Sequence, residues 1–190
     1  MKGILLSIKP KYVSMILNKD KTIEIRKRFP KDYVGWVYIY CTKEQGLARL
    51  YNGRWNDTFV CEKDITDNEF KRMYSGYDGK GKVVARFWCD KVEEIYNDSD
   101  EYYESYYQTD TLAMEDLCEQ SCLDYNELND YLCEEQGKAI HITNVQPFDK
   151  PKELDEFWNN GKKVKGHKGT YQYSKLTRAP QSWCYVEIGE

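Results

Sequence analysis

A short segment of alternating polar and apolar residues, Asn18 to Phe29, constrains the fold more than any other part of the chain. Its two isoleucines share one parity, while Thr22, Glu24 and Arg26 share the other. Successive side chains of a β-strand point to opposite faces, so the pattern predicts a strand with one apolar face and one charged face. The charged face is either an ordinary solvated surface or one wall of a binding cleft, and the alternation alone leaves both readings open.

The rest of the chain alternates predicted strands with predicted helices. Runs of apolar, aromatic and β-branched residues predict five further strands, at Gly3–Ile8, Trp36–Cys41, Lys82–Val92, Lys138–Gln146 and Ser182–Ile188. Apolar residues at helical spacing predict three helices, at Pro10–Asn18, Thr111–Cys122 and Asp124–Gln136. This order predicts a mixed α+β fold with a strongly bent sheet or a small barrel.

Some predicted boundaries have a local cause. Pro10 fits the first turn of a helix, and Asn18 can end that helix in a left-handed conformation. Asp124 followed by Glu127 resembles a capping box. Short helices are predicted within Ile65–Tyr74 and Pro151–Trp158, and the Gly- and Lys-rich stretch from Asn159 to Lys175 is predicted to be mobile.

The length of 190 residues predicts a single domain spanning residues 1–190. Turn residues are frequent between about residues 43 and 80, which predicts an insertion between core strands. A second insertion, acidic and helical, is predicted at about residues 97–136. A chain of this size buries enough apolar surface to fold without disulfides or metals.

The composition limits the location and the cofactors that we expect. No apolar run is long enough for a membrane-spanning helix, and the N-terminus shows no cleavable signal, so we expect a cytoplasmic protein without membrane contact. Seven cysteines, an odd number, favour reduced thiols over a disulfide framework. The two histidines, His141 and His167, lie far in sequence from the Cys118 and Cys122 pair, so no metal and no cofactor is predicted.

The net charge of −4 conceals an uneven distribution. Lys2–Lys31 and Lys162–Arg178 are basic, whereas Asp90–Glu135 is acidic with Lys91 as its one basic residue. The two basic segments can bind a polyanion if they converge on one face, because the local potential steers a charged ligand. The acidic face at residues 90–135 is the alternative, a surface for a protein partner.

The N-terminal residues resemble the opening of the ASCH family. The resemblance is carried by Leu5-Leu6-Ser7-Ile8-Lys9-Pro10, Ile16-Leu17 and Lys21-Thr22-Ile23-Glu24-Ile25-Arg26-Lys27-Arg28. The family signature has the form Gly-x-Lys-x-x-Glu-x-Arg, and Lys21, Glu24 and Arg26 fit it, whereas its glycine falls at Lys19. Gly81-Lys82-Val83-Val84 and Ala179-Pro180-Gln181-Ser182-Trp183 resemble the forms seen among phage and prophage proteins. The resemblance implies a PUA-like β-barrel with a cleft beside the first helix.

The resemblance also implies an RNA- or nucleotide-binding module. Its ligand-binding residues would be Lys21, Thr22, Glu24, Arg26, Arg28, Gln181, Ser182 and Trp183. Lysine and arginine would meet phosphate, Glu24 would accept hydrogen bonds from a base or sugar edge, and Trp183 would stack on an unpaired base. Each of these residues also has an architectural interpretation, with Trp183 in the core and Glu24 and Arg26 as a structural ion pair.

An enzymatic alternative comes from the same family resemblance. Some small ASCH proteins hydrolyse the acetyl amide of N4-acetylcytidine with a lysine, a threonine and a glutamate, so the candidate catalytic residues are Lys21, Thr22 and Glu24. The family's threonine position falls at Glu24, and a carboxylate close to Lys21 is expected to keep that lysine protonated. A ribonuclease also stays open, although the signature contains no histidine for acid–base chemistry.

Overall fold

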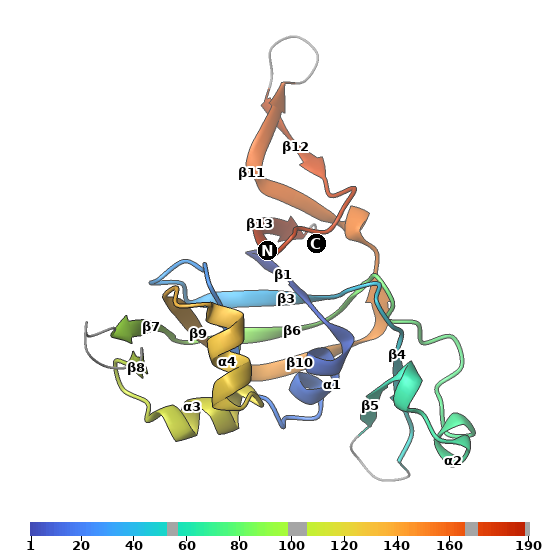
Figure 1. Ribbon diagram of the computed structural model, residues 1–190. Coiled ribbons are helices and arrows are strands. Elements are labelled where there is room, and N and C mark those ends of the chain that lie inside the picture. Colours follow the sequence, from blue (N-terminus) through green and yellow to red (C-terminus); the bar gives the residue numbers. More distant parts are fainter. Residues whose placement is uncertain (53–56, 99–105, 166–170, 189–190) are drawn as a thin grey trace. The chain divides into compact units, whose positions relative to one another are not determined.

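The computed structural model describes residues 1–52, 57–98, 106–165 and 171–188 (Figure 1). Its elements alternate strands and helices in the mixed α+β order that the sequence predicts. The chain forms two compact units, and both are discontinuous in sequence. Unit 1 comprises Met1–Asn18, Trp36–Phe87 and Val145–Glu190, and unit 2 comprises Lys19–Gly35 and Trp88–Asn144.

Unit 1 is built on a seven-stranded sheet in the order β10-β6-β3-β1-β13-β11-β12. The strands are β1 (Lys2–Ile8), β3 (Gly35–Cys41), β6 (Val83–Cys89), β10 (Thr143–Lys152), β11 (Phe157–Lys165), β12 (Tyr171–Lys175) and β13 (Trp183–Ile188). In the middle of the sheet, β1 pairs in parallel with β3 and antiparallel with β13. The described strands leave β10 and β12 as the two ends of an open sheet, so the predicted closed barrel is not confirmed.

The core of unit 1 comes from the apolar runs that predicted its strands. One buried cluster of this core contains Leu5, Tyr38, Tyr40, Val83, Phe157, Leu176 and Val186. The rings of Tyr38 and Phe157 meet edge to face, with 5.2 Å between their centroids. This contact packs β3 against the start of β11, and aromatic pairs of this geometry add about 1 kcal/mol beyond the burial of their area.

Helix α1 (Pro10–Leu17) begins at the proline, as predicted, and buries Val13, Ile16 and Leu17. Its end differs from the prediction. Asn18 keeps a right-handed conformation, with φ −82°, and Lys19 takes the left-handed one, with φ +70°. The left-handed position is the one at which the ASCH signature has glycine. Glycine adopts such a φ without the steric cost that a Cβ brings.

The segment between about residues 43 and 80 forms a small substructure of its own. Strands β4 (Leu47–Leu50) and β5 (Thr58–Cys61) pair as a two-stranded sheet. A 3-10 turn, η1 (Glu62–Asp64), and the short helix α2 (Asp67–Phe70) follow. A capping box of Thr66 and Glu69 starts α2, which is shorter than the predicted helix.

Unit 2 contains a four-stranded antiparallel sheet in the order β2-β9-β7-β8. Its strands are β2 (Ile23–Arg26), β7 (Val92–Asp98), β8 (Tyr106–Thr109) and β9 (Gly137–His141). The predicted helical pair is confirmed as α3 (Met114–Ser121) and α4 (Tyr125–Leu132), with the Asp124–Glu127 capping box in place. The insertion boundaries and the protein-binding role of the acidic face stay predictions.

The helices supply part of the core of unit 2. The buried cluster contains Ile23, Ile25, Ile95, Tyr107, Leu117, Leu128, Leu132 and Ala139. Both isoleucines of the alternating segment are in it, together with leucines from α3 and α4. The acidic helices therefore bury their apolar stripes against β2 and its neighbouring strands.

The region after Val145 differs most from the sequence prediction. Where a helix over Pro151–Trp158 was expected, the chain continues β10, passes through a single 3-10 turn, η2 (Leu154–Glu156), and enters β11. The stretch from Asn159 to Lys175, expected to be mobile, contributes to β11 and β12, which form the hairpin in Figure 1; residues 166–170 lie outside the described residues. In the part of the chain that is described, no helix is long and apolar enough to cross a membrane.

Candidate functional site

Strand β2 places the charged residues of the signature against the C-terminal end of α3. The Thr22 N–H donates to the Gln120 carbonyl at 2.9 Å, which fixes the start of the strand. Glu24 is only 5% exposed, although its parity is opposite to that of the two core isoleucines. The charged face of the strand is therefore buried, and the solvated alternative does not hold for Glu24.

Glu24 is the centre of a buried ionic network. One of its carboxylate oxygens lies 2.8 Å from Arg26 Nη2, and the other lies 3.4 Å from Lys21 Nζ. Lys21 is 2% exposed and also donates a short hydrogen bond to the Ser121 carbonyl. The Glu24 carboxylate thus pairs with two cations, and the Ser121 carbonyl at the end of α3 accepts a further hydrogen bond from Lys21.

Burial changes the protonation equilibrium of Lys21. Desolvation lowers the pKa of Lys21 below its ordinary value, and the nearby Glu24 carboxylate offsets only part of this effect. A carboxylate at this position was expected to keep Lys21 protonated. The two groups are indeed close, but the loss of hydration outweighs their attraction.

The other two predicted ligand-binding residues of this segment are Thr22 and Arg28. Thr22 is exposed, and its hydroxyl lies 3.4 Å from Gln120 Oε1. Arg28 follows β2 and is exposed as well. Exposed residues therefore flank the network along the chain, with Thr22 before Glu24 and Arg28 after Arg26.

The remaining predicted residues, Gln181, Ser182 and Trp183, belong to unit 1. Ser7 of β1 holds their loop through two hydrogen bonds: its hydroxyl donates to the Pro180 carbonyl at 2.7 Å, and its N–H donates to the Ser182 carbonyl at 2.9 Å. Gln181 between them is exposed. The convergence of this loop with Lys21, Glu24 and Arg26 stays a prediction.

An open groove of about 490 Å³ lies beside this loop in unit 1. Residues 174–180 line it together with Asn159, Trp183, Cys184 and Tyr185. The indole of Trp183 meets the ring of Tyr185 edge to face, with 5.5 Å between centroids. Trp183 therefore lines a cavity rather than filling the core, while Lys175 and Arg178, missed by the motif, line the same groove.

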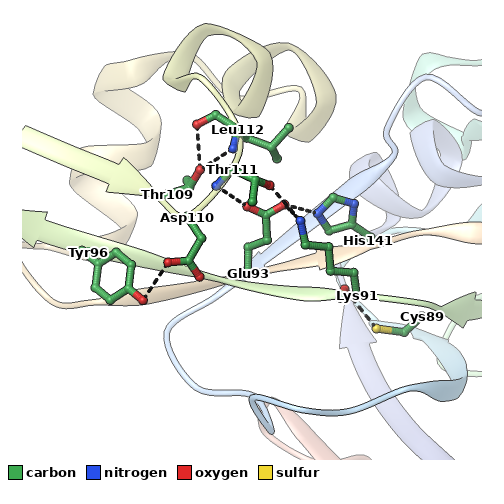
Figure 2. Close-up of polar contacts among 9 residues, drawn as sticks. All are labelled: Cys89, Lys91, Glu93, Tyr96, Thr109, Asp110, Thr111, Leu112 and His141. Atoms are coloured by element: carbon green, nitrogen blue, oxygen red, sulfur yellow. Dashed lines mark hydrogen bonds and ion pairs between the residues drawn. The ribbon is translucent and has the colours of Figure 1, made fainter.

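A second polar cluster, absent from the predicted site, surrounds Glu93 on β7 (Figure 2). The Glu93 side chain is 1% exposed, and its carboxylate lies 2.8 Å from Lys91 Nζ and 2.9 Å from His141 Nε2. The Thr111 N–H donates to it at 3.1 Å, and Lys91 Nζ also donates to the Thr111 hydroxyl at 2.7 Å. Figure 2 shows the carboxylate between these three partners.

Several donors keep Glu93 ionised. Burial alone would raise the pKa of Glu93, but hydrogen bonds and charge from Lys91, Thr111 and His141 together lower it below its ordinary value. A weak sequence signal was present, since Lys91 is the one basic residue of the acidic segment. The pairing of Glu93 with His141, on a strand far along the chain, left no local pattern.

The described residues contain no group of three or more histidine, cysteine, aspartate or glutamate side chains that could hold a metal ion. All seven cysteines are free thiols in the structure. The buried Cys41 and Cys89 have pKa values raised to about 12 because desolvation disfavours their thiolates. The described thiols at these two positions are therefore inert fillers of the core.

The fold and the two polar clusters define a mixed α+β protein with one charged cluster on the edge strand β2 and another on the inner strands β7 and β9. Among solved structures, the chain is similar to ASCH from Zymomonas mobilis, with 15% identity and a TM-score of 0.50 over 97% of this chain and 87% of that chain. Two variants of that protein match over 97% of this chain with 15% identity and TM-scores of 0.49 and 0.48. No family model and no curated protein matches the sequence.

The similarity to the Zymomonas structure establishes the fold alone. It agrees with the ASCH resemblance of the N-terminal signature, which was based on a short sequence motif and not on the fold. The resemblance to phage and prophage forms stays a prediction.

Proposed function

We propose that the protein binds RNA or a nucleotide through the charged edge of β2. The observation that carries the proposal is the buried network in which Glu24 holds both Lys21 and Arg26. Two cations around one carboxylate leave an excess of positive charge, which favours a phosphate ligand. The ASCH-like fold and the signature at these residues support the same ligand class.

The geometry gives each residue a separate role. Glu24 fixes the Arg26 guanidinium, whose side chain remains 14% exposed at the edge of the network. A guanidinium held in this way loses little further side-chain freedom when it contacts a phosphate. Arg28, exposed just after the strand, extends the positive edge. Lys21 is too buried to contact the ligand directly. Its role is to pair with the Glu24 carboxylate that holds Arg26.

Binding to a labelled single-stranded RNA of about eight nucleotides tests the proposal, a length within the roughly 4–16 nucleotides that one OB fold covers on a single strand. Arg28→Ala and Arg26→Gln are expected to weaken binding and to make it less dependent on salt, since each removes a phosphate contact. Lys71→Ala is the matched control: it also removes one exposed positive charge, but from the end of α2.

Circular dichroism melting shows whether each variant stays folded. Binding that is unchanged in folded Arg28→Ala and Arg26→Gln would contradict the proposed edge. Equal weakening by Lys71→Ala would show a general charge effect without a defined site.

A second candidate is an amidohydrolase acting on a modified nucleoside such as N4-acetylcytidine. The lowered pKa of Lys21, caused by burial, is the observation that favours it, because a neutral amine can accept a proton from a nucleophile. Thr22 is the nearest hydroxyl in sequence, but it bonds to Gln120 at the exposed margin. Chromatography of N4-acetylcytidine incubated with the protein tests the activity, with Lys21→Met as the inactive control.

The Glu93 cluster gives a specific reason to test a ribonuclease as well. His141 bonded to a buried carboxylate is an acid–base group of the kind that the signature lacks. Cleavage of end-labelled RNA by the wild type and by His141→Gln tests for ribonuclease activity and for a role of His141 in it. Cleavage that survives this substitution would remove His141 from any catalytic role.

A further inference from the structure

The groove in unit 1 has a one-sided charge. Its lining includes the cations Lys175 and Arg178, and among the described lining residues there is no aspartate or glutamate. The acidic residue Glu156, on η2 before β11, is paired with Lys152 at 3.1 Å. The groove is therefore a local positive site in a chain whose net charge is −4, and it favours an anionic ligand.

One wall of the same groove is aromatic. Trp183 and Tyr185 are two residues apart on β13, so their side chains share one face of the strand. Their rings stand almost perpendicular, at 87°, and Tyr185 is 42% exposed. An exposed aromatic surface next to cations is the combination on which unpaired bases stack while their phosphates are neutralised.

The backbone around the groove is held at both ends. The Leu176 N–H donates to the Phe157 carbonyl at 2.8 Å, and the Pro180 carbonyl accepts from Ser7. Thr177 and Arg178 lie between these anchors and are exposed. In the part of the chain that the structure describes, Arg178 makes no hydrogen bond or ion pair, so its guanidinium is available to a ligand.

We infer that this groove binds one unpaired nucleotide of a single-stranded nucleic acid. The phosphate lies at Lys175 and Arg178, and the base stacks on the Trp183 and Tyr185 wall. The volume of about 490 Å³ is within the range of small-ligand sites, about 300–1,000 Å³. The inference rests on the proposed function and adds to it a strand preference, because a base within a duplex has no free face to stack.

Fluorescence anisotropy with the same labelled RNA in single-stranded and duplex form tests the inference, with DNA of the same sequence as a further arm. The Lys175→Ala and Arg178→Ala double variant is expected to weaken single-strand binding about tenfold or more. It is also expected to reduce the log–log salt slope by about 0.7, because one phosphate contact is lost. The Lys63→Ala and Lys71→Ala double variant is the matched control, because it removes two exposed positive charges from the same unit.

The aromatic wall is tested separately. Tyr185→Leu keeps an apolar side chain but removes the ring, and it is expected to weaken single-strand binding several-fold without changing the salt slope. Trp183→Phe retains an aromatic face and is expected to bind more tightly than Trp183→Leu. Equal binding by the ring-free variants and the wild type would overturn the stacking role.

The outcomes separate this inference from the proposed function. If Arg28→Ala weakens binding and the groove double variant binds within twofold of the wild type, the groove assignment is wrong and the proposed function survives. If the wild type binds neither form of the RNA nor the DNA, both fail. Duplex binding as tight as single-strand binding would overturn the strand preference.

Discussion

The Lys21 ammonium and the Glu24 carboxylate lie 3.4 Å apart with both side chains almost fully buried, yet the pKa of Lys21 is lowered. The desolvation of the lysine exceeds its attraction to the glutamate, which Arg26 shares. Burying these charged side chains costs stability, and removing one of them would leave another buried charge unpaired. It also gives Lys21 an amine that loses its proton more readily than a surface lysine.

Removing the Lys21 amine is expected to destabilise the fold. Lys21→Ala deletes the long side chain and leaves Glu24 with only Arg26, so we expect a loss of about 3 kcal/mol in the free energy of unfolding. Lys21→Met keeps the apolar part of the side chain and is expected to cost less. Urea unfolding at about pH 7 measures both. A cost below about 1 kcal/mol for Lys21→Ala would show that the ion pair contributes little.

The same lysine is expected to make stability depend on alkaline pH. Its folded pKa lies below the ordinary value of 10.5, so the unfolded state binds more protons between the two values. The wild type should therefore gain stability relative to Lys21→Met as pH rises through that window, since the buried charge disappears. Unfolding curves of both proteins at several alkaline pH values measure the difference, and a constant difference would contradict the lowered pKa.

Glu93→Gln is expected to change the acid side of the stability profile. The folded pKa of Glu93 is below 4.5, so its contribution is complete above that value and is lost as pH falls through the folded pKa. At about pH 7 the substitution should cost about 2 kcal/mol, because Lys91 and His141 lose their shared carboxylate. The variant should also lose less stability on acidification than the wild type.

His141→Gln separates the partners of Glu93. It removes one neighbour of the carboxylate but leaves Lys91 and the Thr111 N–H in place. A smaller loss than that of Glu93→Gln is expected in the same urea experiment. If the two variants have equal stability at every pH, Glu93 is not the centre of the cluster.

Local patterns predicted much of the secondary structure. The alternation around Ile23 and Ile25 predicted β2, and Asp124 with Glu127 predicted the start of α4. Both signals act within a few residues, so one sequence contains them in full. The strands β11 and β12 had no such signal, because Gly- and Lys-rich segments are typical of loops and become strands here by pairing with neighbours.

The candidate site could be predicted only in part for a related reason. The signature identified Lys21, Glu24 and Arg26, which the structure brings together. Their partner Ser121 comes from the end of α3, and the Glu93 to His141 contact joins β7 to β9. Contacts of this kind depend on strand order and helix placement, and neither is encoded in residue spacing.

Lys19→Gly tests the cost of the left-handed end of α1. Lys19 has φ +70°, which strains any residue with a Cβ, and glycine removes that strain. The greater freedom of glycine in the unfolded chain offsets part of the gain, so we expect about 0.5–1 kcal/mol of stabilisation in urea unfolding. Lys19→Ala keeps a Cβ at the same φ of +70°, so it is the matched control and is expected to retain the strain.

Asn18 is also the anchor between α1 and β5. Its side-chain amide donates to the Phe59 carbonyl at 2.8 Å and accepts from the Phe59 N–H at 2.9 Å, as a neighbouring strand would. Asn18→Ala loses both bonds and should cost about 2 kcal/mol, whereas Asn18→Asp keeps the acceptor and should cost about half as much. Hydrogen exchange at the Phe59 amide measures the local effect: it should become faster in Asn18→Ala and stay close to wild type in Asn18→Asp. Equal protection of this amide in all three proteins would mean that β5 is held by its pairing with β4 and not by Asn18.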